Sequence, residues 1–323
     1  MSLRKLAEER GFLIGAACNP DHLSAGEEEY ESTLSGEFNI TTAERQMKFA
    51  PVQPEQGVFK WGVTSKLTEF TQKHALKLRG HTLTWHHPAQ LPNWLELEKR
   101  SRNEAIEIMR EHIETVVNHF RGDVFWWDVV NEGLAEQGTM YREESPWYRA
   151  IGADYIEMAF RFAHHADPDC KLFYNDYEMD AVNDKSDRCH QMVKQLLDKD
   201  VPIHGIGLQG HIQLDRAPVI DSIAENIDRF GRLGLEVQFT EVDVWLPAEA
   251  GDEALQKQAE YYRDLVGVAV EADCCTAFVT WGVTDKYSWV PKFTDGKYGR
   301  ALLFDENYHP KPAYHAVVEQ LRG

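Results

Sequence analysis

Eight short apolar runs recur along the chain and have the composition of β-strands. They span 12–17, 36–40, 76–85, 124–131, 171–176, 205–211, 236–244 and 277–283. Most of them are nearly continuous rather than alternating with polar residues, which is the pattern of strands that helices cover. The pattern therefore predicts eight buried strands.

Between these runs, apolar residues recur every three or four positions and predict amphipathic helices. The expected helices span 65–75, 103–120, 153–166, 190–199, 222–233 and 253–272. The second of them shows the spacing most fully, at Ile106, Met109, Ile113, Val116, Val117 and Phe120. Asn103 and Asp221 stand near the starts of two helices, where we expect them to act as N-caps.

Strands and helices that alternate in this way predict an α/β fold, a (β/α)8 TIM barrel. A doubly wound open sheet is the structural alternative, but no GxGxxG follows the first run, which removes the usual nucleotide-binding form of that fold. No stretch rich in Pro, Gly or Ser divides the chain, so we expect residues 1–323 to form a single domain. In such a barrel, functional residues are expected where the strands end.

Composition narrows the possible partners. The net charge is −19, from 53 acidic and 34 basic residues, and a field of that sign repels nucleic acid. No apolar run approaches the ~18 residues of a membrane span, and the first residues lack the long apolar stretch of a signal peptide. We therefore expect no nucleic-acid or membrane partner, and a protein that either stays inside the cell or has been processed after export.

The cysteines carry no metal-binding or redox pattern. Cys18, Cys170, Cys189, Cys274 and Cys275 form no CxxC pair and have no HxxxH nearby, so neither a metal site nor a cofactor is predicted. Their odd number leaves at least one thiol free, and we expect buried thiols.

Polar and aromatic side chains gather at the ends of the expected strands. They are Asn39, His81, Trp85, Asn131, Glu132, Asn175, Asp176, Gln209, His211, Glu241, Asp243 and Trp281. Amides and imidazoles hydrogen-bond hydroxyl groups, tryptophan faces stack on sugar rings, and two carboxyl groups can cleave a glycosidic bond.

Each of these side chains also has an ordinary structural interpretation. Glu132 could cap a helix, and His81 could be a core histidine. Glu241 and Asp243 could lie on the solvated face of an edge strand. Because all of these polar groups fall at the same end of separate strands, a site for sugar chemistry is the better interpretation.

Eight motifs along nearly the whole chain resemble those of the family 10 glycoside hydrolases, the endo-β-1,4-xylanases. They are FNITTAERQMKF (38–49), RGHTLTWH (79–86), WDVVNE (127–132), LFYNDY (172–177), GIGLQGH (205–211), FTEVDV (239–244), WGVTDKYSW (281–289) and LLFDENYHPKPAY (302–314). One such motif alone would be weak, but eight in order are very specific. The resemblance implies a cofactor-independent enzyme that hydrolyses xylan or xylo-oligosaccharides.

The resemblance also implies catalytic roles. Glu132 would be the general acid/base and Glu241 the nucleophile of a retaining, double-displacement mechanism, with the carboxyl groups about 5–5.5 Å apart. His211 would hydrogen-bond Glu241, with Asp243 behind it orienting the ring. Glu132 would keep its proton near neutral pH while Glu241 stays ionised, because two close carboxylates push their proton affinities apart.

The remaining implied residues would contact the sugar chain. Asn131 would contact the 2-hydroxyl of the sugar in the cleaved position. The other expected contacts are His81, Lys48 and Gln209 around that sugar, Glu44 at the next donor sugar, an aromatic wall of Trp85, Trp281 and Trp289, the lining residue Tyr177 near the nucleophile, and Asn175 behind them.

Two departures from the family pattern remain open. Arg45 stands where the family has an asparagine after the glutamate. It could swing aside and pair with a nearby acid, or it could hold a carboxylate on the substrate, such as a uronic acid branch. In WHHPAQLPNW (85–94), three residues rather than one separate Trp85-His86 from Gln90, which either reshapes the donor-side wall or extends a surface loop.

Three other functions are possible for a barrel with these residues. A β-1,4-glucanase or mixed-specificity glycosidase on the same barrel is the main alternative, because one hydroxymethyl group separates glucose from xylose. A sugar-binding barrel without catalysis is disfavoured by the presence of both carboxylates. A metal-dependent barrel hydrolase would be expected to carry an HxH after the first strand, and FLIGAACNPDH offers none.

Overall fold

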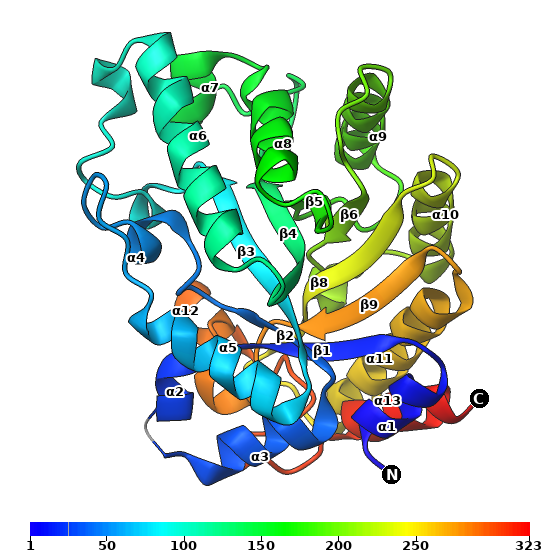
Figure 1. Cartoon of the computed structure of the whole chain (residues 1–323). Coiled ribbons are helices and arrows are strands. Elements are labelled where there is room, and N and C mark those ends of the chain that lie inside the picture. The colour runs from blue at the N-terminus through cyan, green and yellow to red at the C-terminus, as the bar shows by residue number, and fades with distance from the viewer. Residues whose placement is uncertain (25) are drawn as a thin grey trace.

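The computed structural model describes residues 1–24 and 26–323, and within them eight parallel strands close into a barrel (Figure 1). The barrel strands are β1 Leu13–Cys18, β2 Ile40–Ala43, β3 Lys77–Trp85, β4 Val124–Asn131, β5 Lys171–Asp176, β6 Gly205–Leu208, β8 Glu236–Pro247 and β9 Cys275–Thr280. Neighbours along the sequence pair side by side, and β9 pairs with both β8 and β1, which closes the ring. The predicted (β/α)8 fold is confirmed.

Two short strands extend this barrel beside β8. β7 His211–Gln213 pairs parallel with β8, with His211 opposite Asp243. β10 Tyr298–Gly299 pairs antiparallel with the far end of β8. The register of β7 brings the imidazole of His211 beside the Asp243 carboxyl, so this extension belongs to the candidate site.

Helices surround the barrel (Figure 1). Six of them match the predicted ones, namely α5 Gly62–His74, α6 Arg102–His119, α8 Tyr155–Ala166, α9 Asp184–Leu197, α10 Ile220–Gly231 and α11 Asp252–Glu271. The other α-helices are α1 Leu3–Glu9, α2 Pro20–Ser24, α3 Glu28–Glu37, α4 Phe49–Val52, α7 Pro146–Ile151, α12 Val290–Phe293 and α13 Pro312–Arg322. Four 3₁₀ turns are η1 Pro88–Gln90, η2 Leu97–Lys99, η3 Leu214–Arg216 and η4 Asp285–Tyr287. Helices α1 and α13 pack together, so the two chain ends lie close to each other.

Three local predictions were wrong. The N-cap of α6 is Ser101, which forms a capping box with Glu104, and Asn103 lies inside the helix. Asp221 likewise lies in the first turn of α10, behind its N-cap Val219. A carboxylate there still favours the helix through the dipole.

The third wrong prediction concerns Asn39, which was expected at the end of a strand. Residues 36 and 37 finish α3, and the strand begins only at Ile40, so Asn39 lies at the opposite end of the barrel from the site. Its side chain accepts a hydrogen bond from the Ile14 backbone N–H at 2.8 Å and donates to the Phe12 carbonyl at 3.1 Å. Asn39 therefore fastens β2 to the start of β1.

The barrel interior holds a buried ion pair among apolar side chains. Arg79 and Asp128 are each 1% exposed and pair across β3 and β4. Gly80 precedes His81 on β3, and a Cβ there would lie 2.2 Å from the Trp127 ring, so only glycine lets this indole fit against the strand. Buried charges are costly unless paired, and here both partners also reach other polar groups.

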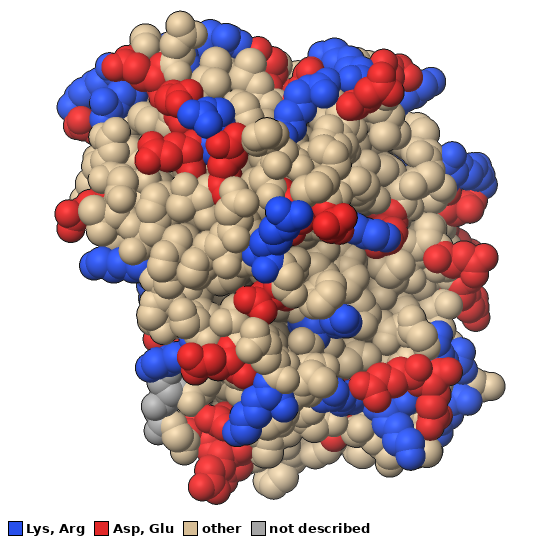
Figure 2. All heavy atoms as spheres, in the orientation of Figure 1, with Lys and Arg blue, Asp and Glu red and all other residues tan. Residues whose placement is uncertain are grey.

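The surface carries both signs of charge. On the face seen in Figure 2, acidic and basic side chains lie beside one another in small groups. Pairs such as Arg110–Glu114 at 2.8 Å and Arg161–Glu157 at 3.0 Å are typical. Across residues 1–24 and 26–323, no helix is long and apolar enough to span a bilayer. All five cysteines are free thiols, and all but the partly exposed Cys274 are buried.

Candidate functional site

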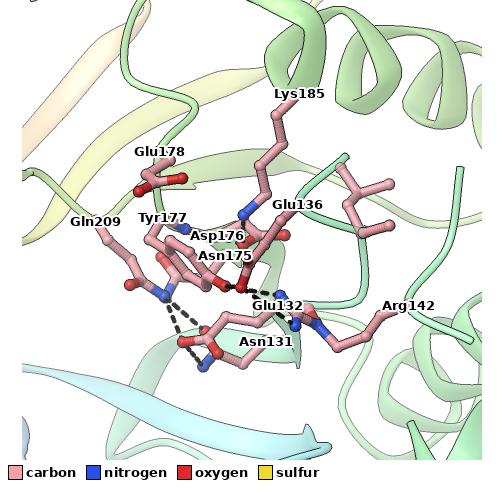
Figure 3. A network of polar contacts seen from close by, with 12 residues as sticks. Asn131, Glu132, Glu136, Arg142, Asn175, Asp176, Tyr177, Glu178, Lys185 and Gln209 are labelled. Carbon is pink, nitrogen blue, oxygen red and sulfur yellow. Dashed lines mark hydrogen bonds and ion pairs between the residues drawn. The ribbon is translucent and has the colours of Figure 1, made fainter. Parts of the chain in front are cut away.

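Glu132 and Glu241 lie at the same end of the barrel and are joined through two amides. Glu132 directly follows β4, and Glu241 lies in β8. The Asn131 amide donates to Oε1 of Glu132 at 3.1 Å, and the Asn175 amide donates to Oδ1 of Asn131 at 2.8 Å and to Oε1 of Glu241 at 2.7 Å. Figure 3 shows the Glu132 half of this network. The structure therefore brings both predicted carboxylates and both predicted amides into one cluster.

The backbone of Glu132 is in a conformation that is uncommon for a residue other than glycine. Its φ is 55°, immediately after the last strand residue, Asn131. Its N–H donates to the Asn175 carbonyl at 2.9 Å, and its own carbonyl accepts from Nε of Arg142 at 3.0 Å. Left-handed backbone at a bulky residue costs on the order of 1–3 kcal/mol and persists where surrounding contacts impose it. The chain turns sharply here, so the carboxyl group faces into the cluster.

Burial is the main reason that the pKa of the Glu132 carboxyl lies above its ordinary value. It raises the pKa of Glu132, and the negative charges of Asp176 and Glu241 add to this effect. Hydrogen bonds from Trp85 Nε1 at 2.7 Å and Gln209 Nε2 at 3.1 Å act in the opposite sense, but they do not reverse the direction.

The Glu241 carboxyl is in the opposite electrostatic state. Burial by itself would raise its pKa, but the positive field of its neighbours, His81 and His211 foremost, outweighs burial and lowers the pKa to about 2. Nε2 of His211 lies 3.4 Å from Oε2 of Glu241, and Nδ1 of His81 lies 3.8 Å from Oε1. Glu241 is buried and Glu132 largely so, yet their surroundings push their proton affinities apart.

His211 and Asp243 form a supported pair behind Glu241. Nδ1 of His211 donates to Oδ1 of Asp243 at 2.8 Å. Burial would lower the pKa of His211, but the Asp243 and Glu241 carboxylates raise it to about 10. The indole N–H groups of Trp245 and Trp289 also donate to Asp243, the latter at 2.7 Å. The imidazole is therefore fixed in orientation and carries a positive charge at neutral pH.

Tryptophans and a buried lysine form the wall beside the carboxylates. Lys48 Nζ lies 4.6 Å from the centre of the Trp85 ring and 5.6 Å from that of Trp281. Burial lowers the pKa of Lys48, although Glu241, Glu132 and Glu44 oppose this. Trp281 packs edge-on against the His81 ring at 5.2 Å between centroids. All three predicted wall tryptophans, Trp85, Trp281 and Trp289, thus touch residues of the cluster.

Three other predicted residues lie at the edges of this cluster. Glu44 follows β2, and burial raises its pKa to about 7 against the opposing charge of Lys48. Tyr177 lies on the Glu132 side, where its hydroxyl donates to Glu136 at 2.6 Å and accepts from Arg142 at 2.8 Å (Figure 3). Arg45 is exposed in the turn after β2.

In the longer loop after Trp85, the three residues that separate His86 from Gln90 are exposed. They begin the turn η1, and the His87 ring lies 4.9 Å from that of Trp85. The loop therefore lies on the surface and places an imidazole beside the Trp85 ring.

Two pairs of supporting residues were not predicted from the sequence. Asp128 accepts from Nδ1 of His81 at 2.9 Å, and Arg79 pairs with the same carboxyl group. The signal was present, because an arginine and an aspartate inside two apolar runs need partners. Arg142 and Glu136 come from the loop after β4, and no pattern in that stretch indicated them.

A hollow of about 560 Å³ opens beside the cluster. It is bounded by 178–185 after β5 and by 211–218 around β7. Among the described residues, no group of three His, Cys, Asp or Glu side chains is arranged to hold a metal ion.

The chain is similar in sequence and structure to known glycosidases. The profile of Glycosyl hydrolase family 10 matches residues 2–320. Endo-1,4-beta-xylanase B of Thermotoga neapolitana is 44% identical over 319 residues, covering 98% of this chain and 90% of that protein. The crystal structure of xylanase 10B from Thermotoga maritima superposes with a TM-score of 0.96 at 44% identity, covering 100% of this chain and 98% of that one. Xylanase 10B from Thermotoga petrophila in complex with xylobiose gives the same TM-score and identity, covering 100% and 97%.

Proposed function

This chain belongs to glycosyl hydrolase family 10, and from that membership we propose that it is a retaining endo-β-1,4-xylanase acting on xylan or xylo-oligosaccharides. The observation that carries the assignment of roles is the opposed direction of the pKa shifts of two glutamates in one cluster. Glu132 has a raised pKa, and the pKa of Glu241 is lowered to about 2. A proton donor and an anionic nucleophile are what glycosidic cleavage with retention requires.

In the first step, Glu241 attacks the anomeric carbon of the sugar on the donor side. The bond to the leaving oxygen breaks, and Glu132 gives its proton to that oxygen, which departs as a free hydroxyl group. The sugar is left bonded through its anomeric carbon to the Glu241 carboxylate. His211 helps to keep Glu241 ionised until this attack, because its positive charge lies 3.4 Å from the carboxylate.

In the second step, Glu132 acts as a base. It takes a proton from a water molecule, whose oxygen attacks the same anomeric carbon and displaces Glu241. Two inversions at one carbon restore the original configuration. The charge on Glu241 has been consumed in the covalent bond at this stage, so the repulsion that helped to raise the pKa of Glu132 is absent. Glu132, which gave up its proton in the first step, therefore remains a carboxylate until it takes the proton of the water molecule.

The amides and aromatic rings would hold the sugar chain across this pair. Asn131 and Gln209 donate to Glu132 or lie beside it, so both can reach the sugar at the cleaved bond. We propose that His81 and Lys48 contact the same sugar, that Trp85, Trp281 and Trp289 form its aromatic surroundings, and that Glu44 contacts the next donor sugar. We propose further that residues 1–323 act as one catalytic unit.

The test is reducing-sugar release from plain xylan and from carboxymethylcellulose by wild type, Glu241→Ala and Glu132→Ala. We expect hydrolysis of xylan that is lost in Glu241→Ala. Adding azide to Glu132→Ala should restore turnover of an activated aryl xylobioside and give a β-configured glycosyl azide, because azide needs no base to attack the glycosyl-enzyme. Equal or better hydrolysis of the cellulose substrate would favour a β-1,4-glucanase. Xylan binding without hydrolysis by folded wild type would indicate a sugar-binding barrel.

A further inference from the structure

We propose that Arg45 binds a carboxylate on a branch of the substrate, so that the enzyme prefers xylan decorated with uronic acids. The inference rests on the proposed xylanase function and adds a substrate class to it. It concerns a side chain that does not take part in the catalytic cluster.

Arg45 lies on the barrel face that carries the catalytic pair. It belongs to the turn that follows β2 and leads to Lys48, whose backbone N–H donates to the Arg45 carbonyl at 3.1 Å. The charges of Glu132 and Glu241 raise the pKa of Lys48, and the charge of Arg45 lowers it. Because Arg45 is exposed and its backbone is bonded to that of Lys48, whose Nζ lies 4.6 Å from the centre of the Trp85 ring, Arg45 stands at the rim of this wall, beside the expected path of a sugar chain.

In the described part of the chain, the guanidinium group of Arg45 is exposed and is not paired with an acid. Some other exposed arginines do hold acids, as Arg161 does with Glu157. Within residues 1–24 and 26–323, no hydrogen bond or ion pair reaches the Arg45 side chain, although the net charge is −19. The pairing with a nearby acid that the sequence left open is thus not found in the described residues.

The side chain of Gln46 ties the turn that carries Arg45 to residues 19–21. Gln46 accepts from the Arg45 backbone N–H at 3.2 Å and donates to Asn19 at 2.6 Å and to Asp21 at 3.2 Å. The amide of Gln46 thereby holds the carboxylate of Asp21. The turn itself is held by these bonds, so the arginine projects from an ordered base rather than from a loose loop.

A carboxylate on a sugar branch suits this position better than a hydroxyl group does. A guanidinium group has five donors and no acceptor, and its planar fork matches a carboxylate through two parallel hydrogen bonds. Glucuronic-type acids are the carboxylate-bearing units that a sugar chain can carry as side groups. Because Arg45 is exposed, the contact would select among substrates rather than provide most of the binding energy.

The experiment compares one branched oligosaccharide in two forms. A xylo-oligosaccharide with a single uronic acid branch is used as such and after reduction of the carboxyl group to a primary alcohol, which keeps the shape and removes the charge. Selectivity is the ratio of kcat/KM for the acidic form to that for the reduced form. It is measured for wild type, Arg45→Gln, Arg45→Lys and Arg232→Gln, the last being an exposed arginine at the end of α10, paired with Asp228.

We expect Arg45→Gln to lower this selectivity by roughly three- to tenfold, between the values for an exposed ion pair and a bidentate charged contact. The selectivity of Arg45→Lys should lie between those of wild type and Arg45→Gln, because lysine keeps the charge but lacks the planar fork of the guanidinium group. Arg232→Gln should have the same selectivity as wild type. Raising the salt concentration should lower the selectivity of wild type and leave that of Arg45→Gln unchanged. Unchanged selectivity in Arg45→Gln overturns the proposal. Unbranched xylotetraose is run in parallel, and failure of wild type to cleave it would instead overturn the xylanase function.

Discussion

Replacing His211 with glutamine would test how the nucleophile is kept ionised. His211 carries a positive charge at neutral pH, because its pKa is raised to about 10 by Asp243 and Glu241 against the effect of burial. Glutamine keeps a hydrogen-bond donor of similar reach but has no charge. Asp243 keeps its indole donors from Trp245 and Trp289, so the aromatic wall should stay in place.

The size of the effect follows from the 3.4 Å between Nε2 of His211 and Oε2 of Glu241. At an effective dielectric constant of about 20, two unit charges at that distance attract by about 5 kcal/mol. The difference between a charged and a neutral hydrogen bond is smaller, on the order of 1 kcal/mol. Since 1.36 kcal/mol corresponds to one pH unit, we expect the acid limb of the rate profile to move upward by about one to three pH units.

The direction of the change in the pKa of Glu241 depends on which form of its carboxyl group the charge of His211 stabilises. A neighbouring cation stabilises the carboxylate, so its removal raises the pKa of Glu241 above the wild-type value of about 2. At pH 7 the nucleophile remains ionised in both proteins, whereas near pH 4 the variant should be partly protonated. We therefore expect a much larger loss of activity at pH 4 than at pH 7.

The assay is kcat/KM for an activated aryl xylobioside from pH 3 to pH 9, with circular dichroism at each pH to show that the protein is folded. His309→Gln is the matched control, because His309 is 77% exposed and lies far from the cluster in the sequence. The alkaline limb, which we attribute to Glu132, should stay in place. An acid limb that does not move in His211→Gln would refute the idea that this imidazolium holds the nucleophile in its ionised form.

Three further predictions concern substitutions of Gly207, Glu132 and Glu44. Gly207→Ala would place a Cβ 2.1 Å from Oδ1 of Asn175, so we expect a loss of both activity and melting temperature, whereas Gly36→Ala, with nothing within 4 Å, should be neutral or slightly stabilising. Glu132→Gln should lower kcat/KM by about 10²–10⁴ for substrates with poor leaving groups and far less for a dinitrophenyl leaving group, because only the former need a proton; equal losses would contradict the acid role. The pKa of Glu44 is raised by burial from 4.5 to about 7, so the native state keeps a proton that the unfolded chain releases, and stability falls as pH rises through that window. Glu44→Gln should therefore show a smaller drop in melting temperature between pH 5 and pH 8 than wild type, and an unchanged drop would mean that Glu44 does not titrate there.

The sequence indicated the barrel because its apolar runs and helical periods are local properties. A run such as 124–131 is apolar whatever surrounds it, and eight such runs alternating with helices leave few architectures. The same runs also showed where polar groups begin, which is why Glu132 and Glu241 could be selected before their surroundings were known. The predictions that failed were of helix and strand ends. Ser101 rather than Asn103 caps α6, and Asn39 precedes its strand, because end positions depend on a single hydrogen bond more than on periodicity.

Only the tertiary structure decided how two chemically identical glutamates come to differ. Burial acts in the same direction on both pKa values, but Glu132 is near the negative charge of Asp176, whereas Glu241 lies between His81 and His211. Those partners come from strands that are distant in the chain, so neither proton affinity could be obtained from local sequence. The sequence by itself determined which groups stand at the strand ends, through the apolar pattern that builds the barrel. Closure of the barrel determined their distances and charges, and a pKa depends on those distances because electrostatic interactions act through space rather than along the chain.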